Sequence, residues 1–268
     1  YAVEAELLLE KAVGLNRTAL FLRGEEPLSA EAAMQYEGFL AERESGRPTQ
    51  YILGTWEFMG LPFSVGEGVL IPRGDTEILV ETILEKQQTE PLRTILDIGT
   101  GSGCIPVSLS HYGKFEHVLA VDISRKALGY ATKNAAANHA EISFYESDLF
   151  QNVPAQWRGQ LDAIVSNPPY IPSHDIEGLE PEVRDYEPRM ALDGRADGLA
   201  FYRILAQGCR KHLAPGGCVY MEIGFDQGLP VRQMFEAHGY VQVEVMKDMA
   251  GLDRVVRAGW KETGENYV

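Results

Sequence analysis

Residues 94–103 read TILDIGTGSG, a short apolar run followed directly by a glycine-rich loop. The run TILDI has the length and composition of a buried β-strand, and a helix is predicted from about residue 103. A strand, a glycine turn and a helix in this order are typical of an open parallel sheet, in which ligands bind beyond the carboxyl ends of the strands. The stretch therefore predicts an α/β domain with a ligand site at the loop.

The C-terminal part of the chain continues this alternation of apolar strands and helices. Further strands are predicted at 118–122, 142–146, 162–166, 217–223, 241–246 and 254–258, and helices at 124–138, 198–212 and 226–238. Such alternation predicts a doubly wound, mostly parallel sheet of seven strands with helices on both faces. We assign residues 73–268 to this α/β domain.

The first fifty residues predict a small helical domain instead. Apolar residues recur at helical spacing in 3–13 and 30–44, with Ser29 as a candidate N-cap and Gly46 as a stop signal. We assign residues 1–50 to this domain. Its sequence fits a partner-recognition domain and equally a helical lid or a dimerisation element.

From Tyr51 the pattern changes to the aromatic-rich TWEFMGLPFSV, which a glycine and a proline interrupt. This predicts a β-hairpin within a connector, residues 51–72. A helix capped by Asp75 or Thr76 and running to about Gln88 is predicted to follow the connector.

The composition restricts the class of protein. Of the 268 residues, 45% are hydrophobic, which is ordinary for a globular protein. The chain has 24 Lys and Arg against 39 Asp and Glu, so its net charge is −15. Because an acidic surface repels nucleic-acid phosphates, we expect no direct nucleic-acid partner.

Cysteine spacing and hydropathy point to a cytoplasmic protein without a metal site. Cys104, Cys209 and Cys218 lack CxxC spacing, which argues against a structural zinc and a disulfide framework, and the histidines have no metal-ligand spacing either. No apolar run reaches the roughly 18 residues of a membrane span, and glutamates interrupt the N-terminal segment, unlike a signal peptide. We expect a cytoplasmic monomer that holds no metal and enters no membrane.

The loop after the first strand predicts a nucleoside site. It consists of Gly99, Thr100, Gly101, Ser102 and Gly103. Glycines let the backbone approach a ligand closely, and the amides at the start of the following helix favour polar ligand groups. The spacing G-x-G-x-G fits a nucleoside bound without a pyrophosphate better than it fits NAD.

Carboxylates end the next two strands. Asp122 can accept hydrogen bonds from both hydroxyls of a ribose, although it can also cap a helix. Asp148 offers a carboxylate to an exocyclic amine, and Leu149 and Phe150 offer apolar side chains to sandwich a purine. A solvated loop acid is the alternative interpretation of Asp148.

The segment after the fourth strand, Ser166-Asn167-Pro168-Pro169-Tyr170, predicts binding of a planar –NH2 group. Each proline holds the preceding residue extended and lacks an N–H, which leaves neighbouring carbonyl oxygens free. The Asn167 side-chain oxygen and the Pro168 carbonyl oxygen can accept the two hydrogens, with Tyr170 over the flat face. Two acceptors place electron density on a weakly nucleophilic nitrogen and orient it toward an electrophile. A tight turn that only ends a strand is the alternative.

Together these motifs resemble the class I S-adenosylmethionine-dependent methyltransferases that carry N-P-P-Y. More narrowly, the chain resembles the protein-(glutamine-N5) methyltransferases specific for peptide chain release factors. The resemblance covers nearly the whole chain through GRPTQYILGTWEFMGLPFSV, LIPRGDTE, EPRMALDGRADGLAFYR, MEIGFDQ and DMAGLDRVV. It implies the Rossmann-like fold of that class. One departure is Gly74, where the family usually has proline.

The resemblance also implies roles for the residues named above. The methionine part of the cofactor S-adenosyl-L-methionine would be held by the glycine loop, which consists of Gly99, Thr100, Gly101, Ser102 and Gly103. Asp122 would hold the ribose, and Asp148 and Leu149 would hold the adenine. Asn167 would lie next to the cofactor. The glutamine amide of a Gly-Gly-Gln loop on a release factor would be held by Asn167, Pro168, Pro169 and Tyr170, of which Asn167, Pro168 and Tyr170 would be catalytic. The helical domain would dock the rest of this partner, and Arg73 and Glu77 would line the pocket.

The implied reaction is an in-line displacement in which the amide nitrogen attacks the sulfonium methyl and S-adenosyl-L-homocysteine leaves. The nitrogen becomes acidic as it gains the methyl, so water or the Asn167 oxygen can take the proton and no dedicated base is needed.

Three other functions fit parts of the sequence. A glutamine methyltransferase acting on a ribosomal protein would share these motifs. An adenine-N6 methyltransferase of DNA or RNA can use the same tetrapeptide, but it needs a basic channel for the backbone, which the charge of −15 disfavours. A non-catalytic module would hold a partner and use the sheet for a structural nucleoside.

Overall fold

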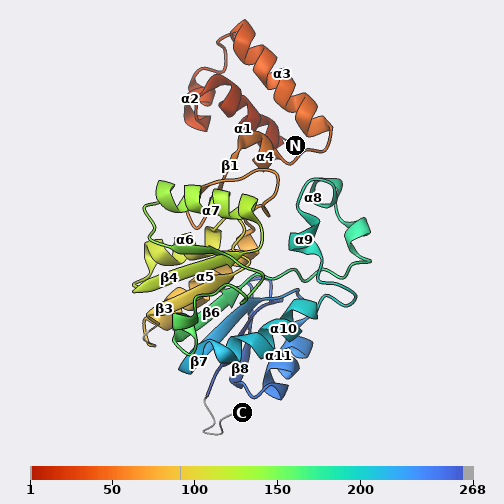
Figure 1. The fold of residues 1–268 in the computed structure, drawn as a ribbon. Helices are drawn as coiled ribbons and strands as arrows, with labels where there is room; N and C mark the ends of the chain where they lie inside the picture. Colours follow the sequence, from red (N-terminus) through yellow and green to blue (C-terminus); the bar gives the residue numbers. More distant parts are fainter. Residues whose placement is uncertain (1, 91, 262–268) are drawn as a thin grey trace.

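The structure, a computed structural model, describes residues 2–90 and 92–261. Figure 1 shows a helical domain at one end of the molecule and an α/β domain below it. The helical domain contains α1 (Ala2–Val13), α2 (Arg17–Leu22), α3 (Ala30–Glu44) and α4 (Thr49–Leu53), and a hairpin of β1 (Thr55–Phe58) and β2 (Leu61–Ser64) follows it. Within the described ranges, the helices are all too short or too polar to cross a bilayer.

Local signals set the ends of α3. The Ser29 hydroxyl accepts a hydrogen bond from the Ala32 amide at 3.1 Å, which confirms the predicted N-cap. The helix ends at Glu44, and Gly46 follows with a φ of 94°. The predicted hairpin is present and begins at Thr55, the first residue of the aromatic-rich stretch. The first residues of the predicted connector instead end the short helix α4, which was not predicted.

Helix α5 (Gly74–Gln87) begins earlier than predicted. Its N-cap is Arg73, and no side chain caps the first turn, so the expectation that Asp75 or Thr76 caps the helix is wrong. Both side chains have tertiary partners instead. Asp75 pairs with Arg254 at 3.1 Å, and the Thr76 hydroxyl accepts a hydrogen bond from Asn167.

A seven-stranded sheet forms the centre of the α/β domain. Its strands are β3 (Thr94–Ile98), β4 (His117–Asp122), β5 (Ser143–Glu146), β6 (Leu161–Ser166), β7 (Leu213–Glu222), β8 (Val241–Lys247) and β9 (Asp253–Gly259). The order is β5-β4-β3-β6-β7-β9-β8, in which β9 runs antiparallel to both neighbours and the other pairs are parallel. The predicted mostly parallel sheet of seven strands is therefore confirmed.

Helices cover both faces of the sheet. One face carries α5, α6 (Cys104–Tyr112), α7 (Arg125–Ala137) and the hairpin, and the other carries α10 (Ala200–Gly208) and α11 (Gly228–Ala237). The predicted helix 198–212 ends as a short 3-10 turn, η3 (Cys209–Lys211), and another such turn, η1 (Ala155–Trp157), precedes β6.

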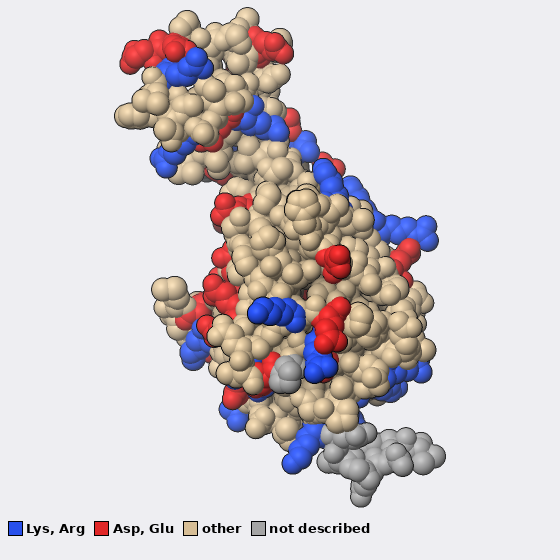
Figure 2. Space-filling view, turned by 90° about the vertical axis from the view of Figure 1, so that its left-hand side faces the viewer, with Lys and Arg blue, Asp and Glu red and all other residues tan. Residues whose placement is uncertain are grey.

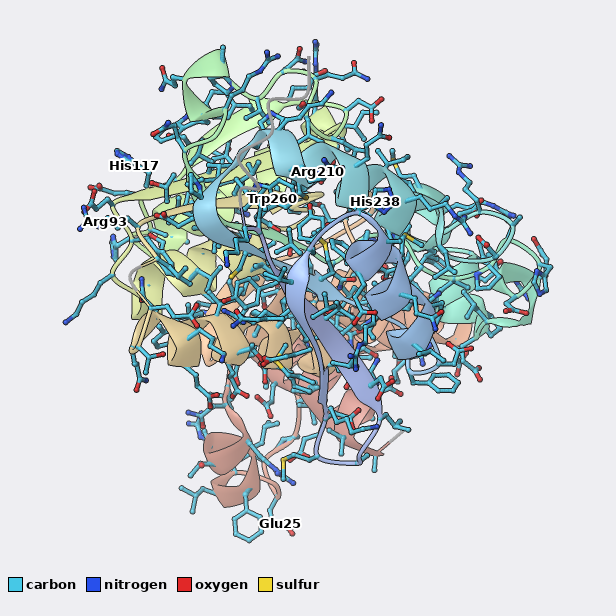
Figure 3. All side chains as sticks on the ribbon, turned by 90° about the horizontal axis from the view of Figure 1, so that it is seen from below. Glu25, Arg93, His117, Arg210, His238 and Trp260 are labelled. Atoms are coloured by element: carbon cyan, nitrogen blue, oxygen red, sulfur yellow. The ribbon has the colours of Figure 1, made fainter. Side chains whose placement is uncertain are left out.

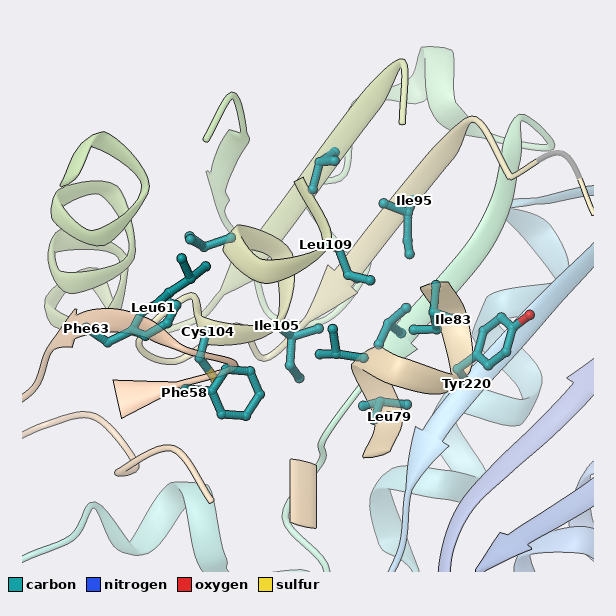
Figure 4. Packing of buried hydrophobic residues seen from close by; sticks show 14 of the residues in the cluster. Phe58, Leu61, Phe63, Leu79, Ile83, Ile95, Cys104, Ile105, Leu109 and Tyr220 are labelled. Atoms are coloured by element: carbon teal, nitrogen blue, oxygen red, sulfur yellow. The ribbon is translucent and has the colours of Figure 1, made fainter. Parts of the chain in front are cut away.

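The hairpin belongs to one of the two hydrophobic cores. Figure 4 shows Phe58 and Phe63 of the hairpin packed with Leu79 and Ile83 of α5 and Ile105 of α6. Each of these side chains is at most 4% exposed. Burying a side chain of this size contributes roughly 1.5–3 kcal/mol, so the hairpin is a structural part of the α/β domain.

Strand β3 lies at the switch point of the sheet. The chain runs from β3 outward to β4 and β5 and then returns to β6 on the other side of β3. The carboxyl ends of β3 and β6 therefore border a crevice, which is where open sheets bind ligands. Figure 3 shows the opposite edge, where Arg93 and His117 lie at the beginnings of β3 and β4 and Trp260 follows β9.

The segment 171–197 joins β6 to α10 and carries η2 (Ile176–Gly178), α8 (Pro181–Arg184) and α9 (Arg189–Leu192). In Figure 1 it lies between the two domains along one side of the molecule. Arg43 of α3 pairs with Glu182 at 2.6 Å, and the Tyr186 hydroxyl donates to the Ser45 carbonyl at 3.0 Å. The segment therefore connects the helical domain to the α/β domain.

Candidate active site

A cavity of about 330 Å³ lies at the switch point, beyond the carboxyl ends of the central strands. The predicted site residues that line it come from four loops and are Gly99, Gly101, Asp122, Asp148, Leu149, Asn167, Pro168 and Pro169. Stretches that follow four different strands therefore meet in one cavity, as the sequence predicts for a parallel sheet.

The glycine loop presents its backbone to the cavity. Gly99 and Gly101 line it, and a Cβ added at either position would meet no other atom within 4 Å. Thr100 and Ser102 are 4% and 3% exposed and do not line the cavity, so their side chains face the protein interior. Gly103 lies behind the cavity as the N-cap of α6.

Asp122 holds the glycine loop and the start of α7. One carboxylate oxygen accepts a hydrogen bond from the Gly101 amide at 2.8 Å, and the other accepts one from the Ser124 amide at 2.8 Å. Ser124 is itself the N-cap of α7. Burial raises the pKa of the Asp122 carboxyl, against the opposing effect of these amides. Each oxygen keeps a second lone pair for a ligand hydroxyl.

Asp97 is a buried carboxyl at the end of β3 that sequence reasoning did not single out. It is 1% exposed, and neither of its oxygens has a well-formed hydrogen bond within the described part of the chain. Burial raises its pKa to about 7, while the nearby Thr100 hydroxyl lowers it and Asp122 raises it. An unpaired buried carboxyl next to a glycine loop is a feature of ligand sites more than of packing.

The apolar side chains of the cavity differ in part from those predicted. Asp148 and Leu149 line it, but Phe150 does not. The Phe150 ring stacks on His212 with their centroids 4.7 Å apart. Phe201 of α10 lines the cavity in its place. The second apolar surface thus comes from a residue remote in sequence.

Asn167 is held by two neighbouring elements. The Ser166 hydroxyl donates to the Ile98 carbonyl at 2.7 Å, which fastens the end of β6 to the end of β3. The Asn167 side-chain nitrogen donates to the Thr76 hydroxyl at 3.2 Å. Because the nitrogen is engaged, the side-chain oxygen is left to act as an acceptor.

The two prolines after Asn167 line the cavity, and Tyr170 lies next to that lining. The Tyr170 carbonyl accepts a hydrogen bond from the Gln227 side chain at 3.0 Å, which fixes its backbone. Burial raises the pKa of the Tyr170 hydroxyl, and the Glu222 carboxyl adds to the rise. Tyr170 therefore stays a neutral phenol beside the cavity.

Comparison with known proteins settles the family. The chain is 43% identical over 254 residues to the release factor glutamine methyltransferase of Geobacter sulfurreducens, covering 95% of this chain and 88% of that protein. It is 44% identical over 264 residues to the protein of the same name from Moorella thermoacetica, covering 97% of this chain and 92% of that protein. The chain belongs to the release factor glutamine methyltransferases. The resemblance inferred from its motifs is confirmed.

Family profiles and a solved structure agree with this membership. Residues 1–54 match the PrmC N-terminal domain, and residues 73–179 match the Methyltransferase small domain. The 16S rRNA N2 G1207 methyltransferase of T. thermophilus superposes with a TM-score of 0.55 at 20% identity, covering 78% of this chain and 50% of that one. The α/β domain therefore has the class I methyltransferase fold, and the protein is a methyltransferase.

Further residues of this methyltransferase line the cavity without having been predicted. They come from the connector, as Gly68, Val69 and Leu70, and from the segment 171–197, as Pro188, Met190, Ala191 and Arg195. Arg73 and Glu77, which were expected in the lining, have other partners. Arg73 pairs with the buried Glu187, and Glu77 accepts a hydrogen bond from the Met59 amide at 2.6 Å. No group of three His, Cys, Asp or Glu suited to a metal occurs among residues 2–90 and 92–261.

Proposed function

We propose that this methyltransferase transfers a methyl group from S-adenosyl-L-methionine to the side-chain amide nitrogen of the glutamine in the Gly-Gly-Gln loop of peptide chain release factors. The observation that carries the proposal is the orientation of Asn167. Its nitrogen is bound to Thr76, so an oxygen acceptor is offered at the cavity beside Pro168, whose carbonyl is the second acceptor. A primary amide has two hydrogens on one nitrogen and matches this pair of acceptors.

The residues of the cavity fit S-adenosyl-L-methionine. Asp122 has lone pairs free for a ribose, and Leu149 and Phe201 offer apolar contact to a ring. The unpaired Asp97 carboxyl is buried at the end of β3, outside the cavity lining, and when ionised it would favour a positively charged ligand group near the glycine loop. Gly99 and Gly101 leave room for close approach of the methionine part. The cofactor supplies a methyl group on a sulfonium, and S-adenosyl-L-homocysteine is the product.

The protein's own contribution to the reaction is orientation and electrostatics. The Asn167 side-chain oxygen and the Pro168 carbonyl oxygen accept hydrogen bonds from the two amide hydrogens of the substrate glutamine. These bonds favour a pyramidal nitrogen with a localised lone pair. Tyr170, kept neutral by its raised pKa, borders the amide as a flat, polarisable surface. The proton leaves after methylation to water or to the Asn167 oxygen.

The three parts of the chain divide the work in this proposal. The helical domain, which extends through α4 to Leu53, recognises the release factor, and the α/β domain performs the transfer. The connector between them adds its hairpin to the α/β core and Gly68, Val69 and Leu70 to the cavity wall. On the face shown in Figure 2, the blue and red side chains of described residues are interspersed, and they form no broad basic surface for a nucleic-acid backbone. The interspersed charges, with a net charge of −15, favour a protein substrate over DNA or RNA.

Transfer of label from S-[methyl-14C]adenosylmethionine tests the proposal. The enzyme is incubated with release factor, ribosomal proteins or nucleic acid in parallel, and mass spectrometry then locates the methyl group. One added methyl on the glutamine of the Gly-Gly-Gln loop is expected. Label confined to a ribosomal protein or to nucleic acid would overturn the substrate assignment, and no label in any acceptor would overturn the proposed catalysis.

A further inference from the structure

Two buried residues lie behind Asn167, away from the cavity lining. Thr76 on α5 is 2% exposed, and Glu222 at the end of β7 is 1% exposed. The Thr76 hydroxyl accepts the hydrogen bond from the Asn167 side-chain nitrogen at 3.2 Å. Neither residue is among those assigned a role in the proposed reaction.

The Glu222 carboxyl faces two hydroxyl groups. The hydroxyls of Thr76 and Tyr170 lie close enough to lower its pKa as hydrogen-bond donors, and its buried Oε2 atom has no well-formed hydrogen bond within the described part of the chain. Other ionisable groups surround it from every packed element: Asp75 on α5, Arg254 on β9, Cys104 on α6 and Tyr202 on α10. Burial raises the pKa of Glu222 to about 7, against the opposing effect of the Thr76 hydroxyl and of Arg254.

The direction of the Thr76 hydrogen bonds decides what Asn167 offers to a substrate. The two ends of an asparagine amide have nearly the same shape, so packing alone hardly distinguishes them. If Thr76 donated to Asn167, the amide would turn and present its –NH2 to the cavity, where it would oppose the –NH2 of the substrate. A hydroxyl that already donates to a carboxylate can only accept from Asn167.

We propose that Glu222 and Thr76 are positioning residues that fix the orientation of the Asn167 amide. In this relay the Thr76 hydroxyl donates a hydrogen bond to the Glu222 carboxylate and accepts one from the Asn167 nitrogen. The Asn167 oxygen is thereby turned to the substrate. This inference rests on the proposed role of Asn167 as an acceptor.

Single and double variants test the relay. Thr76→Val and Glu222→Gln are each expected to lower kcat by about tenfold to a hundredfold, the usual range for groups that orient a functional side chain, with cofactor affinity unchanged. Thr76→Ser keeps the hydroxyl and is expected to retain activity. The double variant should be no slower than Thr76→Val alone, because Glu222 acts on Asn167 through Thr76. Thr82→Val, another buried threonine of α5, is the control for folding.

The pH profile gives a second readout. A protonated Glu222 can itself donate to Thr76, so kcat of the wild type should fall as pH drops below about 7, and Glu222→Gln should lose this dependence. Independent, multiplicative losses in the double variant, or full activity of Thr76→Val, would overturn the relay. Asn167→Ala is measured alongside. If that variant keeps its activity, the role of Asn167 itself fails, and if it alone loses activity, only the relay fails.

Discussion

Asn167 has two different hydrogen-bonding tasks on one side chain. Its nitrogen is anchored to Thr76 inside the protein, and its oxygen is left at the cavity. Glutamine at this position would be longer, and aspartate would lack the donor that anchors the side chain. The proposed role therefore requires asparagine here, because its amide supplies a donor for the anchor and an acceptor for the substrate.

Asn167→Ala should reduce methyl transfer by about a hundredfold or more, the scale seen when a positioned hydrogen-bonding group is removed. Cofactor affinity should change little, since the glycine loop and Asp122 are untouched. Transfer is measured with labelled cofactor and binding by calorimetry. Gln160→Ala, an exposed residue at the other end of β6, is the matched control. Transfer that survives in Asn167→Ala would refute the positioning role.

At the scale of elements, the start of α5 accounts for the one departure from the family pattern. Gly74 is the first residue of the helix, a position that favours proline because its N–H needs no helical partner. Arg73 before it has φ −107° and ψ 143°, which is the conformation that a residue preceding proline adopts. The backbone is thus already shaped for the residue that the family usually has.

Gly74→Pro should therefore stabilise the protein by about 0.4–1 kcal/mol, because it restricts the unfolded chain without straining the folded one. A Cβ at this position meets no atom within 4 Å. Urea denaturation measures the gain, and Gly129→Pro in the middle of α7 should instead destabilise, since it removes a helical hydrogen bond. A loss of stability in Gly74→Pro would show that the segment is strained.

The glycine loop contains two kinds of glycine. Gly101 (φ 56°) and Gly103 (φ 81°) both have the left-handed conformation, which costs alanine about 1–2 kcal/mol. A Cβ at Gly103 would also lie 3.0 Å from the backbone of Ala131 in α7, whereas one at Gly101 meets nothing. Gly103→Ala should therefore lower the melting temperature more than Gly101→Ala, and Gly101→Ala should lower cofactor affinity more. The opposite order in either measurement would contradict this division.

The sequence predicted the strands and loops that short-range sequence determines. The strands 94–98 and 162–166 and the loops after them follow from short apolar runs and from glycine and proline chemistry. Contacts between distant elements were not predictable. Phe201 lines the cavity where Phe150 was expected, and the Asp97 carboxyl has no hydrogen-bond partner within the described part of the chain. Both depend on tertiary packing, which no sequence period encodes.

At the scale of the whole molecule, the segment 171–197 connects the helical domain to the cavity. Arg43 of the helical domain pairs with Glu182, and a few residues later Pro188, Met190 and Ala191 line the cavity. The buried Glu187 between them binds Arg73 and the Ile71 amide. A partner that displaces α3 would thus act on the cavity wall through this segment.

Arg43→Gln should loosen this connection. Because the Arg43 and Glu182 side chains are 20% and 40% exposed, the loss of global stability should be at most about 1 kcal/mol. Amide hydrogen exchange in residues 181–195 should nonetheless become faster, as read by mass spectrometry. Arg232→Gln, which breaks an exposed pair on α11, is the control. Unchanged exchange in 181–195 would mean that the bonds of Tyr186 and Glu187 hold the segment without Arg43.

Two buried carboxyls should make the stability of the whole protein depend on pH. The folded-state pKa of Asp97 and that of Glu222 are each raised to about 7, from ordinary values of 3.8 and 4.5. The folded state then binds more protons than the unfolded state between these limits. The stabilisation is therefore complete below about pH 4 and is lost as pH rises through about 7.

Asp97→Asn removes one of the two groups that bind a proton more tightly in the folded state than in the unfolded state. Without cofactor, the free energy of unfolding of the wild type should fall between pH 5 and pH 7, and each group contributes a slope of at most about 1.4 kcal/mol per pH unit. The variant should show a clearly shallower fall in urea denaturation, since asparagine fills the same space without ionising. Asp226→Asn, on an exposed loop, should follow the wild type. Parallel curves for Asp97→Asn and the wild type would show that Asp97 is already ionised in the folded protein at pH 5, which contradicts a raised pKa for this carboxyl.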